Sequence, residues 1–319
     1  MNEFELIRQY FARPATDAVL GVGDDAALLR PTPGCELHVA VDMLVEGRHF
    51  FADVDPADLG HKTLAVNLSD MAAMGAVPRW ALLSLALPRA DTGWVSRLAS
   101  GLFALAGRHG VTLVGGDTTR GPLTLSLTIL GEAPAGTALR RDGAREGDDI
   151  WVSGELGLAA LALAHRLGTL DEELPDEVRG LAEARMDRPE PRVALGVALR
   201  GLVHSAIDVS DGLLADLSHI AAASGVAGEV WLDALPSHPW LEARRAWCAA
   251  LLAAGGDDYE LCFTAPRSAR EAVLQAGARA GCRVSRIGMI HAGQGVELLD
   301  AHGTPCYLGR SGFDHFDTP

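Results

Sequence analysis

The chain has 319 residues, of which 48% are hydrophobic and 22% are charged, and its formal net charge at pH 7 is -15. This apolar content excludes wholesale disorder, and the length exceeds that of one average domain, so we expect two domains. The negative charge excludes a nucleic-acid backbone as the main partner, because such binding needs a basic surface.

The N-terminal residues, MNEFELIRQYFARP, predict an amphipathic helix with four apolar side chains on one face. These side chains are Phe4, Ile7, Tyr10 and Phe11. The segment lacks the basic and apolar regions of a signal peptide, and the apolar stretch 156–167 is too short to span a bilayer. The cysteines are scattered and form no CxxC pair, which is typical of reduced thiols, so we expect a cytoplasmic protein.

The first part of the chain alternates short strands with longer helices. Strands are expected at 37–41, 80–87, 111–114 and 123–130, and helices at 56–74 and 92–109. A loop rich in glycine, proline and charge follows at 133–148. We expect the domain boundary in this loop, with domains at 1–135 and 136–319.

The second part repeats the alternation. Strands are expected at 150–153, 206–209, 229–232, 259–264 and 283–290, and helices at 156–167, 211–223, 240–254 and 268–280. The acidic stretch from Asp171 predicts a solvated loop, and Pro189 and Pro191 mark a break before a further helix. Both parts therefore indicate an α/β or α+β fold.

Aspartates recur at the ends of apolar runs, next to glycine or other small residues. They are Asp24, Asp25, Asp42, Asp70, Asp117, Asp208 and Asp211. Clustered carboxylates repel one another unless a cation neutralises them, and Mg²⁺ prefers such oxygen ligands and usually accompanies a phosphate. The pattern predicts an acidic, metal-filled cleft to which both parts of the chain contribute.

Several of these aspartates also have an ordinary structural interpretation. Asp24 and Asp25 could form a simple turn, and Asp42 could cap a helix or turn. Asp70 lies in an apolar helical segment, where a carboxylate needs a compensating cation or hydrogen bonds unless it is exposed.

Three glycine-containing or polar segments could bind phosphate. GGDTTRG (115–121) can present backbone N–H groups to phosphate while its aspartate holds Mg²⁺, or it can form a tight hairpin. Asp208, Ser210 and Asp211 lie at a strand end and a helix N-terminus, where they could bind phosphate or cap the helix. In GGDDYEL (255–261) either aspartate could contact a ligand or close a hairpin.

The boundary loop contributes two adjacent cations. Arg140 and Arg141 could reach phosphate, or remain solvated. His49 and His109 are isolated, as structural histidines usually are.

The signatures of P-loop kinases, protein kinases, serine hydrolases and zinc proteases are all missing from the sequence. The motifs that are present favour metal-assisted phosphoryl transfer from a nucleotide, which depends on positioning and charge neutralisation. If the acceptor is itself a phosphate, no strong general base is needed.

The ordered motifs resemble those of the thiamine-monophosphate kinase family, within the aminoimidazole ribonucleotide synthetase-like superfamily. They cover nearly the whole chain: GVGDDAALL, VDMLVEGRHF, DPADLGHKTLAVNLSDMAAMGA, LVGGDTTRGPL, SAIDVSDGLLADLSHI, GGDDYELCFT and the terminal GFDHF. The resemblance implies ATP-dependent, in-line phosphorylation of thiamine monophosphate to thiamine diphosphate with several Mg²⁺ ions. It also implies two α/β (α+β) domains, an N-terminal mixed sheet with helices and a C-terminal α/β domain, with the site between them and a homodimer formed through the N-terminal sheets.

The resemblance further implies a role for each motif residue. The implied metal ligands are Asp25, Asp42, Asp70, Asp117, Asp208 and Asp211. The implied ATP contacts are Gly116, Asp117, Arg141 and Ser210, and the implied substrate contacts are His49, Asp257 and Phe313. No residue is implied as an acid–base catalyst.

Two positions depart from the family pattern. Ala40 and Val41 precede Asp42 where the family often has hydroxyl residues, and Asp257 stands where a glutamate is common. A sister enzyme of the superfamily is disfavoured, because the chain lacks both an N-terminal catalytic cysteine and a cysteine-containing C-terminal tail. A non-catalytic binding protein with the same fold is the alternative from another functional class.

Overall fold

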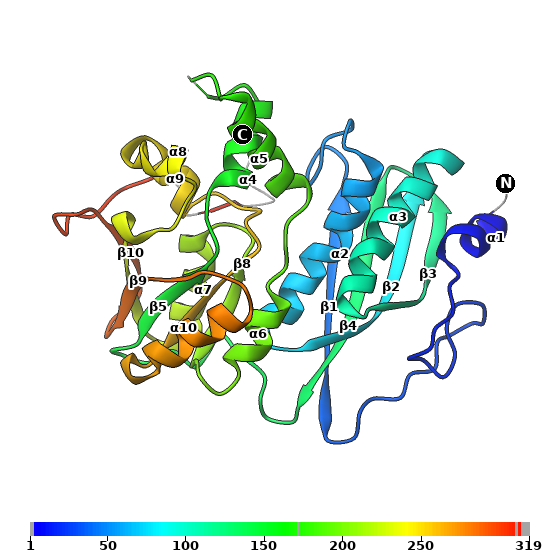
Figure 1. Cartoon of the computed structure of the whole chain (residues 1–319), viewed down its shortest axis with the longest axis horizontal. Helices are drawn as coiled ribbons and strands as arrows, with labels where there is room; N and C mark the ends of the chain where they lie inside the picture. The colour runs from blue at the N-terminus through cyan, green and yellow to red at the C-terminus, as the bar shows by residue number, and fades with distance from the viewer. Residues whose placement is uncertain (1–2, 171, 310–311, 314–319) are drawn as a thin grey trace. The chain divides into compact units, whose positions relative to one another are not determined.

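The structure is a computed structural model of the chain, and it describes residues 3–170, 172–309 and 312–313. The chain divides into two compact units (Figure 1). The first contains residues 1–71 and 76–136, and the second contains residues 72–75 and 137–319. In the described residues each unit has its own sheet.

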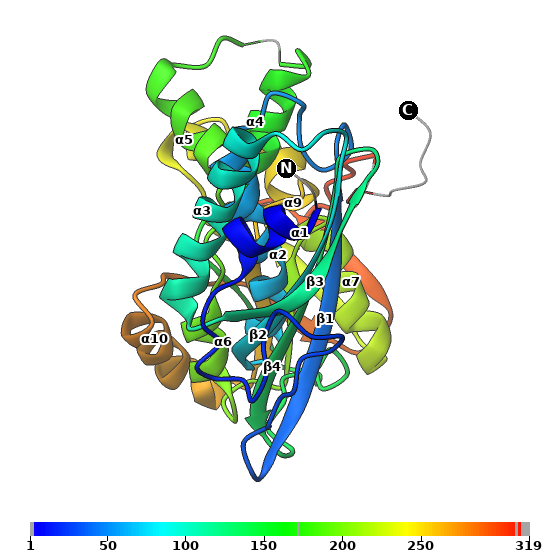
Figure 2. The same cartoon turned by 90° about the vertical axis from the view of Figure 1, so that its right-hand side faces the viewer.

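The first unit contains a four-stranded mixed sheet in the order β1-β4-β2-β3. Its strands are β1 (Cys35–Val45), β2 (Val77–Leu87), β3 (Thr112–Arg120) and β4 (Thr124–Pro134). Strand β4 is antiparallel to both β1 and β2, whereas β2 and β3 are parallel. Helices α2 (Pro56–Ala73) and α3 (Thr92–His109) cover one face of this sheet (Figures 1 and 2).

Helix α3 has the predicted bounds because both of its ends are signalled locally. The Asp91 side chain accepts a hydrogen bond from the Trp94 N–H, and Gly110 ends the helix at a φ of 65°. The helix crosses α2 closely, since a Cβ atom at Gly101 would lie 1.8 Å from the Ala57 carbonyl oxygen. Its buried stripe consists of Val95, Leu98, Ala99, Gly101, Leu102, Leu105 and Ala106.

Strand β3 is longer than the sequence predicts. GGDTTRG was expected to form a loop or a tight hairpin, and both expectations are wrong, because the segment continues β3 beside β2 up to Arg120. Gly116 has a φ of 141°, and a Cβ atom there would lie 1.9 Å from the Leu83 carbonyl oxygen. Glycine at this position therefore permits a close approach of two strands.

The N-terminal segment is only partly the predicted amphipathic helix. It forms α1 (Glu3–Leu6) followed by a π-helical turn (Ile7–Phe11). The π-helical spacing places Leu6 and Phe11 on the same buried side, whereas Phe4 is 71% exposed. The predicted place of Phe4 on the apolar face is wrong for this reason.

The second unit contains a six-stranded sheet in the order β10-β7-β9-β5-β8-β6. Its strands are β5 (Asp149–Ser153), β6 (Ser205–Val209), β7 (Ala227–Trp231), β8 (Glu260–Ala265), β9 (Val284–His291) and β10 (Gly295–Leu299). Neighbouring strands are antiparallel except β7 and β10. Trp151 of β5 stacks on Phe263 of β8 with ring centroids 6.4 Å apart, and both side chains are buried.

The helices of the second unit are short. They are α4 (Leu158–Arg166), α5 (Asp176–Asp187), α6 (Val193–Leu199), α7 (Leu213–Ser224), α8 (Pro239–Glu242), α9 (Arg245–Ala253) and α10 (Arg270–Arg279). Short 3₁₀ turns lie at 232–234 and 267–269. The expected helix at 240–254 is divided into α8 and α9, and the sequence prediction missed α5 and β10. The α/β (α+β) class is confirmed.

Within the described residues no helix is both long and apolar enough to cross a membrane. All five cysteines are free thiols: Cys35, Cys248, Cys262, Cys282 and Cys306. This agrees with the expected absence of a disulfide framework.

Candidate active site

The loop between β6 and α7 places three predicted site residues side by side. Asp208 is buried on β6, and Ser210 and Asp211 follow the strand in a partly exposed loop. Helix α7 begins at Leu213, two residues later than the sequence predicts. Gly212 precedes it at a φ of 128°, a conformation that favours glycine.

A carboxylate further along the chain holds this loop. One oxygen of Asp216, Oδ2, accepts hydrogen bonds from the N–H groups of Ser210, Asp211 and Gly212, at 3.0, 3.1 and 3.2 Å. Of the two alternatives for Ser210 and Asp211, capping of α7 is therefore wrong, because the residue before the helix is Gly212 and makes no side-chain cap. The carboxylate that binds these N–H groups comes from within the first turn of the helix itself.

The surroundings of Asp216 are acidic. Burial, together with the charges of Asp208 and Asp211, raises the pKa of Asp216 to about 7, against the hydrogen bonds from Gly212 and Ser210. The three carboxylates are therefore close enough to repel one another. The sequence prediction missed Asp216, although it lies among the buried Leu213, Leu214 and Leu217. The sequence did contain a signal for this residue, because an aspartate among the apolar positions of a helix needs a polar partner.

The segment from 255 to 259 is attached to the same loop. The Asp257 N–H donates to the Ser210 carbonyl, and the Tyr259 N–H donates to the Val209 carbonyl, both at 2.8 Å. Asp257 and Tyr259 have positive φ angles of 67° and 50°, which are uncommon for residues other than glycine. The hairpin expected here is wrong, because the segment connects helix α9 to strand β8.

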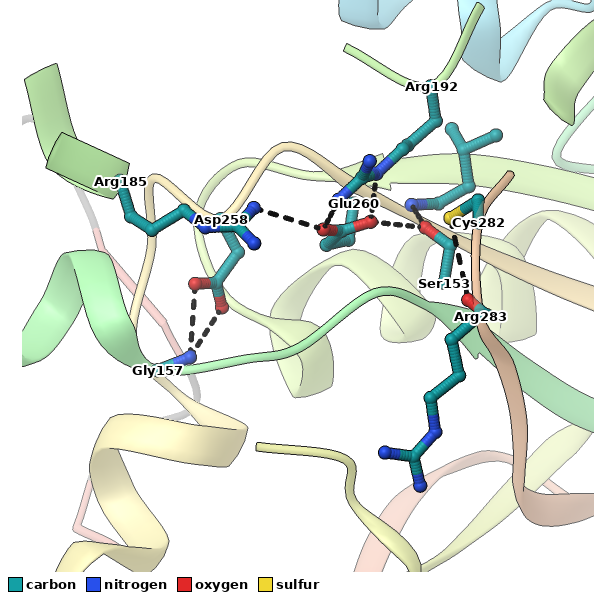
Figure 3. A network of polar contacts seen from close by, with 9 residues as sticks. Ser153, Gly157, Arg185, Arg192, Asp258, Glu260, Cys282 and Arg283 are labelled. Carbon is teal, nitrogen blue, oxygen red and sulfur yellow. Dashed lines mark hydrogen bonds and ion pairs between the residues drawn. The ribbon is translucent and has the colours of Figure 1, made fainter. Parts of the chain in front are cut away.

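The Asp258 side chain lies against Gly157, the residue that precedes α4 (Figure 3). Both of its carboxylate oxygens lie within hydrogen-bonding distance of the Gly157 N–H, at 3.0 and 3.1 Å. Desolvation of the carboxylate raises the pKa of Asp258 well above its ordinary value, and the charges of Glu260 and Asp257 act in the same direction. Of the two aspartates in this motif, Asp258 is thus an internal anchor.

Glu260 continues the anchoring at the start of β8 (Figure 3). Its carboxylate is buried, forms a two-point ion pair with Arg192 and accepts a hydrogen bond from the Ser153 hydroxyl. Arg185 lies 4.0 Å from the same carboxylate. These contacts fix the beginning of β8 against the end of β5, next to the strained residues 257–259.

Phe313 also contacts the β6–α7 loop. Its N–H donates to the Asp211 carbonyl at 2.9 Å, and the residue is 42% exposed. The rest of the terminal GFDHF motif, residues 314–316, lies outside the described residues. The second unit thus brings Asp208, Ser210, Asp211, Asp257 and Phe313 together.

Arg141 is placed differently. It is exposed, its carbonyl accepts a hydrogen bond from the Ser224 hydroxyl, and the neighbouring Arg140 carbonyl bonds the Ala206 N–H near the start of β6. The backbone of Arg141 therefore lies at the opposite end of β6 from Ser210. Its predicted ATP contact remains a prediction.

The predicted residues of the first unit lie on different elements. Asp25 is exposed in a bend, Asp70 is partly buried near the end of α2, and Asp117 is exposed on β3. Asp42 lies within β1, opposite Leu127 of β4, so the expected capping role for it is wrong. The expected strand at 37–41 is in fact longer at both ends.

Two of these side chains make local hydrogen bonds. The Asp117 carboxylate accepts a hydrogen bond from the Thr118 N–H at 2.9 Å. His49 follows β1, and its Nδ1 atom accepts the Val45 N–H at 3.0 Å. The metal, nucleotide and substrate roles that the resemblance implies for these residues, and for Gly116 on β3, remain predictions.

A cation would suit the carboxylates of the β6–α7 loop, because a hard divalent ion relieves their mutual repulsion. Among the residues that the structure describes, however, no group of three or more His, Cys, Asp or Glu side chains is arranged to hold a metal ion. Mg²⁺ is often bound by one or two carboxylates together with substrate phosphates. The donor set fits a site of that kind.

Comparisons with known proteins place both units in one superfamily. Residues 23–133 match the family described as AIR synthase related protein, N-terminal domain, and residues 145–301 match the corresponding C-terminal domain. The structure matches a crystal structure of thiamine-monophosphate kinase from Stenotrophomonas maltophilia K279a, with 48% identity and a TM-score of 0.83. That match covers 92% of this chain and 94% of the other.

Two further relatives agree. The chain is 44% identical over 330 residues to thiamine-monophosphate kinase of Escherichia coli strain K12, covering 100% of this chain and 99% of the relative. A structure of AaThiL complexed with AMPPCP and TMP has 29% identity and a TM-score of 0.77, covering 90% of this chain and 89% of the other. The expected two-domain fold and the resemblance are confirmed, and the chain belongs to the thiamine-monophosphate kinase family.

Proposed function

We propose that this protein transfers the terminal phosphoryl group of ATP to the phosphate of thiamine monophosphate, giving thiamine diphosphate and ADP. One P–O bond of ATP breaks, and one P–O bond to the acceptor phosphate forms, in a direct in-line transfer. The observation that carries the proposal is the full-length similarity to the thiamine-monophosphate kinase of Escherichia coli. The similarity to AaThiL, whose structure contains AMPPCP and TMP, supports it.

Mg²⁺ belongs to this proposal as the ion that neutralises phosphate charge. Its proposed ligands are the six motif aspartates Asp25, Asp42, Asp70, Asp117, Asp208 and Asp211. Several ions are proposed, each sharing its coordination between these carboxylates and phosphate oxygens. The mutual repulsion within the β6–α7 loop supports this assignment in the second unit.

The chain's own residues bind and orient the two substrates. The proposed nucleotide contacts are Gly116, Asp117, Arg141 and Ser210. On the acceptor side we assign His49, Asp257 and Phe313, where the phenyl ring offers its face to the cationic thiazolium. In the proposed division, domain 1–135 holds those metal, ATP and substrate contacts that precede residue 136, and domain 136–319 holds the others.

A product assay tests the proposal. Purified protein is incubated with ATP, Mg²⁺ and thiamine monophosphate, and the products are quantified by mass spectrometry. We expect thiamine diphosphate and ADP in equal amounts, with none formed when Mg²⁺ is chelated. ADP formation without thiamine diphosphate would assign another acceptor and overturn the proposal.

The uncovered side of strand β1 supports the proposed homodimer. Alternate residues Leu37, Val39, Val41 and Met43 are between 45% and 63% exposed. Such a contiguous apolar row on a sheet marks an interaction surface, and an isologous contact would bury it against its own copy. The free cysteines support the cytoplasmic location proposed for the enzyme.

Charge on this row tests the dimer. Val41→Glu should convert the dimer to a monomer in analytical ultracentrifugation, because the dimer would bury the new carboxylate. Glu36→Gln, next to the row on the same strand, is the matched control. An unchanged mass for Val41→Glu, or a monomeric wild-type protein, would contradict this interface.

A further inference from the structure

Three successive peptide groups of the β6–α7 loop make hydrogen bonds on both of their sides. On one side, the N–H groups of Ser210, Asp211 and Gly212 all donate to Oδ2 of Asp216. Since C=O and N–H point in opposite directions in a trans peptide, the three carbonyls of the same peptide groups face the other side.

These three carbonyls bind the segments that carry the proposed substrate contacts. The Val209 carbonyl accepts the Tyr259 N–H, and the Ser210 carbonyl accepts the Asp257 N–H. The Asp211 carbonyl accepts the Phe313 N–H, and the three distances are 2.8, 2.8 and 2.9 Å. Each peptide group thus joins Asp216 on one side to an acceptor-side segment on the other.

The position of Asp216 allows little freedom. The residue is 3% exposed and belongs to the first turn of α7, where its N–H bonds the Gly212 carbonyl at 2.9 Å. Gly212 closes the loop at a φ of 128°, and a Cβ atom there would lie 2.8 Å from the Ala254 backbone. The carboxylate therefore approaches the three N–H groups from a fixed direction.

We infer that Asp216 is a positioning residue that orients these three peptide groups and so aligns the nucleotide and metal residues with Asp257 and Phe313. The inference rests on the proposed function, because that function assigns the aligned residues to their ligands. One carboxylate oxygen accepts all three N–H groups, and linked hydrogen bonds polarise one another. In this role Asp216 acts through the loop.

The test compares Asp216→Ala with Asp216→Asn in the full-length protein. The alanine variant lacks the acceptor and should lower kcat/KM by roughly 10- to 100-fold, as loss of an orienting partner typically does. Both the KM for thiamine monophosphate and the Mg²⁺ concentration for half-maximal rate should rise. The asparagine variant keeps an acceptor oxygen in the same place and should restore the rate to within roughly fivefold of wild type, because its amide oxygen can accept the same N–H groups.

Asp91 provides the matched control. It also accepts a backbone N–H near a helix start, but it caps α3 in the first unit. Asp91→Ala should lower the melting temperature while leaving both Michaelis constants unchanged. Rates are compared well below the lowest melting temperature, and Asp216→Ser, whose hydroxyl is too short to reach three N–H groups, replaces the alanine variant if that one does not fold.

The outcomes separate the alternatives. Equal losses in Asp216→Asn and Asp216→Ala would show that the charge itself is required, as for a metal ligand, and would overturn the positioning role. Unchanged kinetics in Asp216→Ala would overturn it as well. Calorimetric titration with AMPPCP and Mg²⁺ should rank the affinities of wild type, Asp216→Asn and Asp216→Ala in the same order, and it does not depend on turnover. A wild-type protein that makes no thiamine diphosphate would therefore refute the proposed function and leave the positioning role to be decided by these affinities.

Discussion

Two groups of carboxylates in the second unit are stabilised in different ways. At the start of β5, the fully buried Asp149 forms a two-point ion pair with Arg270 at 2.6 and 2.7 Å, and Arg286 lies 3.4 Å away. In the first turn of α7 and in the segment before β8, Asp216 and Asp258 instead accept hydrogen bonds from backbone N–H groups. Arginine side chains compensate the charge of Asp149, whereas the hydrogen-bond donors to Asp216 and Asp258 are uncharged peptide groups.

The pKa values differ accordingly. Burial acts to raise the pKa of Asp149, but the hydrogen bonds and charges of Arg270 and Arg286 outweigh it and leave the pKa lowered. Burial dominates at Asp216 and Asp258, and neighbouring acids raise both pKa values further. Uncompensated carboxylates are costly for folding, and they accumulate where a ligand supplies the compensation. The comparison supports the proposed functional role of the β6–α7 loop, whereas the ion pairs of Asp149 match a structural role.

The largest expected effect is on turnover in the loop. Asp211→Asn should lower kcat by about 100-fold or more, because it removes a charge proposed to hold the ion that stabilises the transferred phosphoryl group. The same change should leave the melting temperature unchanged or raised, since it relieves repulsion with Asp208 and Asp216. Steady-state kinetics and calorimetry measure both quantities. A near-normal kcat would remove Asp211 from the metal set.

The Asp149 cluster should show the reverse pattern. Arg270→Ala leaves a buried carboxylate with one weaker partner, which should reduce the free energy of unfolding. Because the Arg270 side chain is 44% exposed, solvent screening makes this loss smaller than for a fully buried ion pair. Michaelis constants should not change. Arg279→Ala, an exposed position on the same helix, is the control in urea unfolding.

The smallest effect is in the pH dependence of stability. The contributions of Asp149 and Asp258 to the free energy of unfolding change in opposite directions with pH. The lowered native pKa of Asp149 adds stability that is present above the unfolded pKa of about 4 and is lost as pH falls through the native pKa. The pKa of Asp258 is higher in the native state than in the unfolded state. Above pH ~4 the unfolded chain therefore loses this proton while the native protein keeps it, and the stability that Asp258 contributes is lost as pH rises towards the native pKa.

Asn substitutions separate these contributions. The free energy of unfolding is measured with urea from pH 3 to 8. Asp149→Asn should remove part of its increase as pH rises from 3, and Asp258→Asn should reduce its decrease at higher pH. Slopes of the same sign at both sites would contradict the distinction between the two groups.

Much of the fold could be predicted because its signals are local. Asp91 and Gly110 mark both ends of α3, and the alternating residues of β4 mark a half-buried strand. The failures occurred where tertiary contacts override local preference. GGDTTRG has the composition of a turn, but pairing with β2 keeps it extended. Helix α5 is a different kind of failure, because its local signal was present: Val178, Ala182 and Met186 recur at four-residue spacing.

The candidate site could be predicted only in part for a similar reason. The motif aspartates are visible because they interrupt apolar runs, and the structure brings Ser210, Asp211, Asp257 and Phe313 to one loop. The residue that holds this loop, Asp216, depends on three-dimensional hydrogen bonds that no spacing reveals. The residue types alone did not separate Asp257 from Asp258, and only the resemblance pointed to Asp257; the structure identifies Asp258 as the internal anchor through its contact with the Gly157 N–H.

The central claim is tested most directly with ATP that carries an isotope label in its terminal phosphoryl group. The wild-type protein is mixed with labelled ATP, Mg²⁺ and thiamine monophosphate, and the products are separated and analysed by mass spectrometry. We predict that the label is found in the distal phosphate of thiamine diphosphate, in equal amount to the ADP formed. Label released as inorganic phosphate, with thiamine monophosphate left unchanged, would contradict the assignment.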